Sequence, residues 1–168
     1  MSRGERLREQ EAQQLWHQLC TSTEGRYAAF NRASASSRVR ARQRLLLALE
    51  LRWKLEEQVL LPALQGADAA DRGADQEIGM LRDLAELVSD NTLEAAAAGT
   101  VLAALDGMAM LHSQRIEQAL AQATRTRQID SVVLAREMEG LLNRWRGEQL
   151  LTGGIEDEEA DPVGRAPQ

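Results

Sequence analysis

The residues of this sequence that are best suited to chemistry interrupt stripes of apolar side chains. Arg52 and Glu56 are four residues apart on one such stripe, so they share a face if the segment is helical. His112 interrupts a second stripe, Cys20 lies in the middle of a third, and Asp75 stands at the start of a fourth. Because ionisable groups on facing helices are how helical bundles build metal sites, the pattern suggests a metal centre.

Histidine is nevertheless scarce, since His17 and His112 are the only two in 168 residues. Imidazole nitrogen suits iron, whereas a guanidinium stays protonated and cannot act as a ligand. We therefore expect Arg52 and Glu56 to form a buried, hydrogen-bonded ion pair. We expect His112 to be a core histidine that bonds to Glu56 or to a backbone carbonyl, and Cys20 to be a small core residue. The alternative for Arg52 with Glu56 is a functional site, that for His112 is a role as a ligand, and that for Cys20 is a role as a ligand or a redox thiol.

Five helices are expected to position these groups. Leu and Ala dominate the apolar residues, aromatic residues are few, and only three prolines occur. Pro62 is expected to kink or stop the second helix. The apolar periodicity predicts helices over about 5–33, 37–64, 74–90 and 92–125, and a fifth from a cap at Asp130 or Ser131 to about Arg146. Amphipathic helices with short connections predict an all-α fold, an up-down four-helix bundle with an extra C-terminal helix.

The chain is expected to divide into one bundle domain, residues 1–150, and an acidic tail, residues 151–168. The tail contains the run EDEEAD at 156–161, which is opposed nearby only by Arg165. We expect this tail to be disordered and solubilising, with a docking segment as the alternative. Most of the formal charge of −6 therefore belongs to the tail. The folded part is left close to neutral, and a nucleic-acid partner is not expected.

Composition also predicts the compartment and argues against catalysis. A lone Cys20 cannot form an internal disulfide, the N-terminus lacks the apolar stretch of a secretory signal, and no apolar run approaches the roughly 18 residues needed to span a membrane. A soluble, cytoplasmic protein without membrane association is expected. No glycine-rich phosphate loop or nucleophile–base spacing is present, and Arg52 would keep Glu56 ionised, so an enzyme is not expected.

Several segments resemble the hemerythrin-like, cation-binding helical bundle domains. RWKLEEQVLLPAL at 52–64 is similar to the second-helix signature of that family, and DQEIGMLRDLAEL at 75–87 is similar to its third helix. LHSQRIEQAL at 111–120 is similar to the fourth-helix motif, and LAREM at 134–138 is similar to the segment that often closes these domains. The likeness covers about residues 15–146 and implies a bundle built around a di-iron centre.

Most of the ligands that the resemblance implies are replaced in this chain. The family's histidines fall at Cys20, Arg52 and Asp75, while Ile116 stands where a carboxylate is usual. Glu117 suits the spacing of the oxygen-carrying members. The former ligand positions are therefore Cys20, Arg52, Glu56, Asp75, His112 and Glu117, of which only Glu56 and His112 match directly.

The leading hypothesis is a degenerate hemerythrin-like bundle that has lost its di-iron site, binds no cofactor, and has a structural or protein-interaction role with an unidentified partner. The alternative is an iron-binding redox or gas-sensing protein with a reduced ligand set drawn from Cys20, Glu56, Asp75, His112 and Glu117. Association of copies through the fifth helix and Trp145 is compatible with the first hypothesis.

Overall fold

The computed structural model describes residues 11–67, 73–89 and 95–151, and within these ranges it contains helices and turns but no strand. The prediction of an all-α fold is confirmed. The helical elements are α2 (Glu11–Arg32), α3 (Arg38–Leu55), the π-helical turn η1 (Glu56–Leu60), α4 (Leu61–Gly66), α5 (Ala74–Ser89), α6 (Ala95–Arg125) and α7 (Ser131–Leu151). The fifth predicted helix extends past Arg146, and the predicted acidic tail lies outside the described residues.

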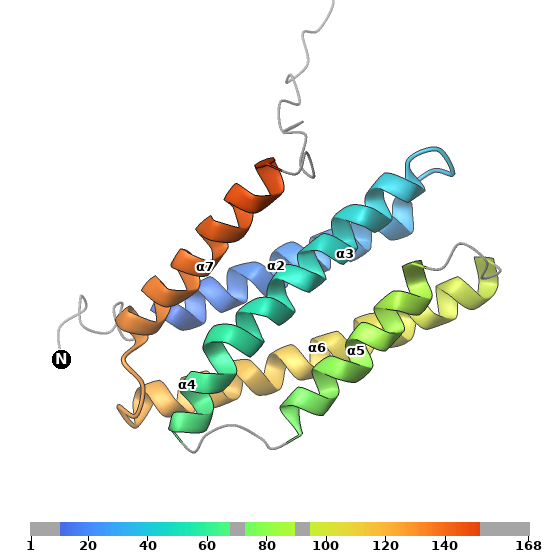
Figure 1. Cartoon of the computed structure of the whole chain (residues 1–168). Coiled ribbons are helices and arrows are strands. Elements are labelled where there is room, and N and C mark those ends of the chain that lie inside the picture. Colours follow the sequence, from blue (N-terminus) through green and yellow to red (C-terminus); the bar gives the residue numbers. More distant parts are fainter. Residues whose placement is uncertain (1–10, 68–72, 90–94, 152–168) are drawn as a thin grey trace, which may run out of the picture.

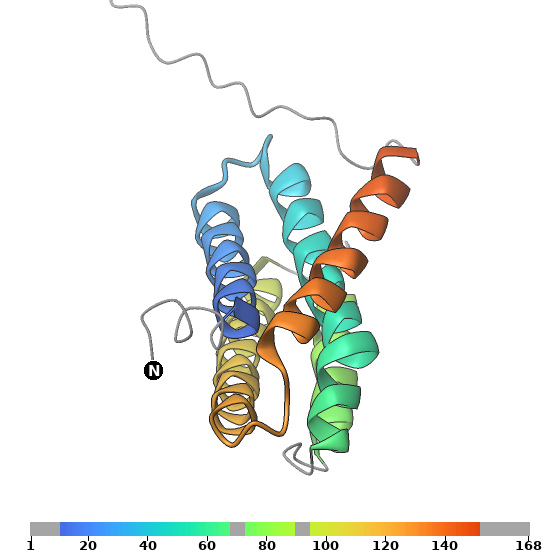
Figure 2. The ribbon, with the colours of Figure 1, turned by 90° about the vertical axis from the view of Figure 1, so that its left-hand side faces the viewer.

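Consecutive long helices run in opposite directions along the molecule (Figure 1). The most extensive contacts are those of α2 with α3 and of α5 with α6, while α2 also contacts α6 and α3 also contacts α5. α7 packs against α2, α3 and η1, and so lies to one side of the other helices (Figure 2). No helix in the described ranges is long and apolar enough to cross a bilayer.

The predicted inward stripes form the core. Each helix contributes apolar side chains to one buried cluster, which includes Trp16, Leu45, Leu49, Ile78, Leu81, Leu105, Leu120 and Met138. Trp145 is only 8% exposed. Its side chain is therefore buried within the chain, and the structure does not offer it as a surface through which copies could associate.

Pro62 neither stops the second helix nor breaks it, because the helical path continues through α4 to Gly66. The local change comes just before the proline, where the Leu61 backbone N–H donates to the Glu56 carbonyl across five residues. This π turn holds one residue more than an α-helical turn. It begins at Glu56, the residue that sequence reasoning placed on the core face.

Candidate functional site

Three charged or titratable side chains meet in the interior. Arg52 from α3 is 3% exposed, Glu56 from η1 is 0% exposed, and His112 from α6 is 2% exposed. Together with Glu77 of α5 and Arg115 of α6, they form what we call the core charge cluster. Since buried charges are costly unless they are paired, the contacts within this cluster decide what it can do.

Glu56 faces a cation with each of its carboxylate oxygens. Its Oε1 lies 3.5 Å from Nε of Arg52, and its Oε2 accepts a hydrogen bond from Nε2 of His112. The predicted burial and ion pairing of Arg52 with Glu56 are confirmed. The predicted hydrogen bond within the pair is wrong, because neither Nε of Arg52 nor Oε1 of Glu56 has a hydrogen-bond partner among the described residues. The predicted bond between His112 and Glu56 is confirmed as well.

His112 faces carboxylate oxygens with both ring nitrogens. Its Nδ1 lies 2.8 Å from Oε2 of Glu77, on the side of the ring away from Glu56. Burial by itself lowers the pKa of His112, but the hydrogen bonds and negative charges of Glu56 and Glu77 outweigh it and raise the pKa above its ordinary value. Since a carboxylate only accepts hydrogen bonds, donation from both nitrogens requires the imidazolium form.

Arg115 extends the core charge cluster to the surface. Its guanidinium donates to Oε1 of Glu77, and Glu77 is partly exposed while Arg115 is largely exposed. The order from interior to surface is Arg52, Glu56, His112, Glu77 and Arg115. Because the charges alternate in sign along this series, each of the two carboxylates lies between two cations.

The guanidinium of Arg52 is held by two neighbouring helices. Its Nη2 donates to the Ala109 carbonyl of α6 at 3.3 Å, and the guanidinium carbon lies 5.7 Å from the ring centroid of Trp16 in α2. The Trp16 indole in turn donates to the Ser113 carbonyl at 3.4 Å. A cation over an aromatic ring is favourable when desolvated, so Arg52 is stabilised by more than its ion pair.

Cys20 lies near this cluster but remains a thiol. Burial raises its pKa to about 11, although the charge of Arg52 and a hydrogen bond with Ser113 act in the opposite direction. The thiolate is the form that binds metal and attacks electrophiles. Cys20 is therefore poorly suited to either role and is placed as the small core residue that the sequence predicts.

The structure separates His17 and Glu117 from this cluster. His17 and Glu117 lie 3.6 Å apart as a surface pair, with side chains 66% and 47% exposed. The expectation that Glu117 could join an interior ligand set is therefore wrong, because its side chain is turned outward. Asp75 begins α5 as expected, but its side chain is outside the described residues.

Sequence reasoning missed Glu77 and Arg115. Glu77 precedes the buried Ile78, and Arg115 follows His112 by three residues, so both lie at the edges of inward stripes rather than within them. Their long side chains reach the cluster from these edges. The sequence did contain a signal for them, because each is a long charged residue close to a buried position on its helix.

The donors present do not fit a di-iron centre. Across residues 11–67, 73–89 and 95–151, no group of three or more His, Cys, Asp or Glu residues is arranged to hold a metal ion. Both nitrogens of His112 and both oxygens of Glu56 are engaged by side chains of opposite charge. A metal ion at Glu56 would also stand beside the permanent positive charge of Arg52.

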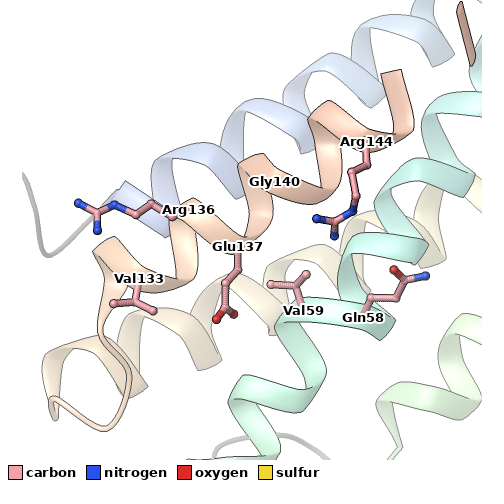
Figure 3. A pocket seen from close by; sticks show the side chains of 7 residues that line it. All are labelled: Gln58, Val59, Val133, Arg136, Glu137, Gly140 and Arg144. Atoms are coloured by element: carbon pink, nitrogen blue, oxygen red, sulfur yellow. The ribbon is translucent and has the colours of Figure 1, made fainter. Parts of the chain in front are cut away.

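A surface groove of about 440 Å³ lies between side chains of η1 and α7 (Figure 3). In this view Glu137 and Arg144 extend from α7 toward η1, while Arg136 points away. The groove is lined by Gln58, Val59, Val133, Arg136, Glu137, Gly140 and Arg144. None of these residues belongs to the core charge cluster.

No protein-family model, curated protein or solved structure matches this chain.

Proposed function

We propose that the chain is a metal-free hemerythrin-like bundle with a structural or protein-interaction role. In this proposal α2, the continuous α3–η1–α4 helix, α5 and α6 form an up-down four-helix bundle, and α7 is the appended helix. The contacts of α2 with α3 and α6, and of α5 with α3 and α6, support this arrangement. The meeting of Glu56 and His112 in the interior supports a relation to the family, because these are the two former ligand positions that match its motif.

The observation that carries the proposal is the mutual neutralisation within the core charge cluster. Glu56 uses both oxygens for Arg52 and His112, and His112 uses its second nitrogen for Glu77. An imidazolium has no lone pair to offer, so binding a metal would require removing a proton from His112 and moving Arg52. The interior is better suited to holding the helices together than to binding a cofactor.

A role in protein interaction is supported by apolar side chains on the surface. Met80 and Leu87 of α5, and Met110 and Leu111 of α6, are each about half exposed. α5 and α6 pack against each other, so these side chains belong to one pair of helices. Contiguous apolar patches are frequent at interaction surfaces, and these four side chains are the ones that such a patch on α5 and α6 would use. A sizing measurement on the purified chain tests whether a second copy covers them.

Metal content tests the proposal. The full chain is purified without an affinity metal from cells grown in iron-supplemented medium, and its iron, zinc and manganese are measured by mass spectrometry. We expect far less than one metal ion per chain, and the same value for the His112→Ala variant. Near-stoichiometric metal that disappears in His112→Ala but persists in the matched surface variant His17→Ala would overturn the proposal.

The alternative is an iron-binding redox or gas-sensing protein with few ligands. Its ligands would be Glu56, Glu77 and His112, which meet in the interior. These side chains would have to move, because no group of three or more His, Cys, Asp or Glu among the described residues is arranged to hold a metal ion. The measurement of metal content distinguishes the two proposals, because the alternative requires bound iron that depends on His112. It also requires Arg52 to leave its present contacts with Glu56 and Ala109.

A further inference from the structure

Positive charge gathers where α2 meets α3. Residues 25–49 contain six arginines and no lysine or acidic residue. We call this region the arginine end, and its arginines are Arg26, Arg32, Arg38, Arg40, Arg42 and Arg44. All are exposed except Arg42, which is half-buried. The overall charge of −6 therefore conceals a local excess of positive charge at one end of the molecule.

Part of this charge has no partner of opposite sign in the described structure. Arg38 stacks over Phe30 at 6.0 Å, but no carboxylate of residues 11–67, 73–89 or 95–151 pairs with Arg26, Arg38 or Arg44. Exposed guanidiniums in such a group are well suited to carboxylates and phosphates, which they bind with two parallel hydrogen bonds. The arginine end therefore fits an acidic occupant.

The last turn of α7 lies at the same end of the molecule as the arginine end, although the two are set apart from each other (Figures 1 and 2). The Ala12 backbone N–H donates to the Ser131 hydroxyl at 3.0 Å, which joins the beginnings of α2 and α7. α2 has 22 residues and α7 has 21, so at about 1.5 Å per residue they are nearly equal in length. They run to the same end of the molecule, where the last turn of α7 and the α2–α3 turn are both found (Figures 1 and 2).

The acidic segment 156–161 follows shortly after this point. It contains five carboxylates within six residues, and it begins five residues after Leu151. An extended chain covers about 3.3 Å per residue, so Glu156 can be about 16 Å from the end of α7 and Asp161 about 33 Å. A short tether also gives an acidic segment a high local concentration near any site that it can reach.

We propose that the arginine end is a carboxylate-binding surface and that its occupant is the acidic segment 156–161 of the same chain. The five carboxylates of this segment are opposite in charge to Arg26, Arg38 and Arg44. Other arginines are less suited to bind this segment. Arg136 and Arg144 line the groove together with the acidic Glu137. Arg125 and Arg127 are at the C-terminal end of α6, which is far from the arginine end (Figure 1). The proposal is independent of whether the core binds metal.

Paramagnetic broadening measures this contact directly in the full chain. A nitroxide label is attached to Ala160→Cys, which leaves every acidic residue in place, and the amide signals of the ¹⁵N-labelled chain are recorded. Native Cys20 is buried, and the wild-type chain treated with the same reagent shows whether it reacts. We expect the amides of residues 34–40 to lose most of their intensity at low salt, and those near the α6–α7 turn to keep theirs. We expect recovery at about 1 M salt, where the Debye length is about 3 Å.

Two sets of substitutions test whether the arginine end is responsible. The variant Arg26→Gln/Arg38→Gln/Arg44→Gln should recover most of the lost intensity, whereas the matched variant Arg125→Gln/Arg127→Gln/Arg136→Gln should not. Circular dichroism of each variant checks that the helices are retained. Absence of broadening at residues 34–40, or equal broadening in both variants, would overturn the proposal. So would equally strong broadening in ¹⁵N chain without a nitroxide that is mixed with spin-labelled chain of natural isotope abundance, because that result assigns the contact to a second copy.

Discussion

Glu56 and Glu57 are neighbours in η1, yet they belong to opposite environments. Glu56 is fully buried in the core charge cluster. Glu57 is 38% exposed and accepts a hydrogen bond from Arg82 of α5 at 3.0 Å, and Arg82 also lies 3.5 Å from Glu50. We call Arg82, Glu50 and Glu57 the surface ion cluster. The hydrogen bond from Arg82 to Glu57 raises the pKa of Arg82, which stays protonated in any case.

Both clusters connect η1 to α5, but an ion pair contributes a different amount to the free energy of unfolding in each. Water screens the surface ion cluster and can replace either partner, so such contacts contribute about 0–1 kcal/mol. In the interior, loss of one partner leaves the other charged and without water, which costs about 3–5 kcal/mol. Burial rather than the number of contacts therefore decides which cluster determines stability.

The largest expected effect is that of Arg52→Met. Removing the guanidinium leaves Glu56 with His112 as its remaining cation and removes the contact with Trp16. We expect the free energy of unfolding to fall by about 3–5 kcal/mol, as measured by urea denaturation. A loss below about 1 kcal/mol would mean that the interior pair is energetically equivalent to a surface pair, and would remove the contrast between the clusters.

His112→Gln is expected to cost about 2–3 kcal/mol, because it removes hydrogen bonds between charged groups. Since the pKa of His112 is raised in the folded state, its contribution to stability is complete below about pH 6.5 and is lost as the pH rises through the folded-state value. Urea unfolding of the wild type between pH 6 and 8 should therefore show falling stability. His112→Gln should flatten this profile, and His17→Gln should leave it unchanged; a flat wild-type profile would show that His112 does not carry an added proton.

The double variant Arg52→Met/Glu56→Met tests whether the cost comes from stranded charge. When both members of a buried pair become apolar, neither leaves the other as a stranded charge, and the effect on stability is often small. His112 keeps Glu77 as its partner in this variant. We expect the double variant to be more stable than either single variant, with a coupling energy of about 1–3 kcal/mol. Additive losses from the two single substitutions would show that packing, and not charge, explains the effect of Arg52→Met.

Arg82→Gln is expected to have the smallest effect, a loss of at most about 1 kcal/mol that shrinks further in high salt. Denaturation at low and high ionic strength measures both quantities. Should this loss equal that of Arg52→Met, the surface ion cluster would be as important as the interior one. The predicted order of the two clusters would then be wrong.

The sequence predicts much of the fold because helical periodicity is local. The stripe through Trp16, Cys20 and Tyr27 and the stripe through Leu49, Arg52 and Glu56 are buried as expected. The ion pair of Arg52 with Glu56 follows from their spacing on one helix, so it is also accessible to sequence reasoning. These predictions need no knowledge of how the helices face one another.

The remaining contacts depend on how separate helices are rotated and aligned. Glu77 of α5 meets His112 of α6, and Glu117 pairs with His17 on the surface. No local pattern determines such contacts between helices. The π turn at Glu56 is similarly hidden, because the sequence shows Pro62 but not that the helix accommodates it by one wider turn.

The protonation state of His112 tests the central claim most directly. Long-range ¹H–¹⁵N spectra of the imidazole at pH 6.5, recorded before and after addition of one equivalent of Zn²⁺, report both ring nitrogens. We predict that His112 is predominantly an imidazolium and that Zn²⁺ leaves its signals unchanged, because Glu56 and Glu77 accept hydrogen bonds from its two N–H groups. A neutral imidazole, or a nitrogen that loses its proton to the metal, would contradict an interior held closed by its own charges.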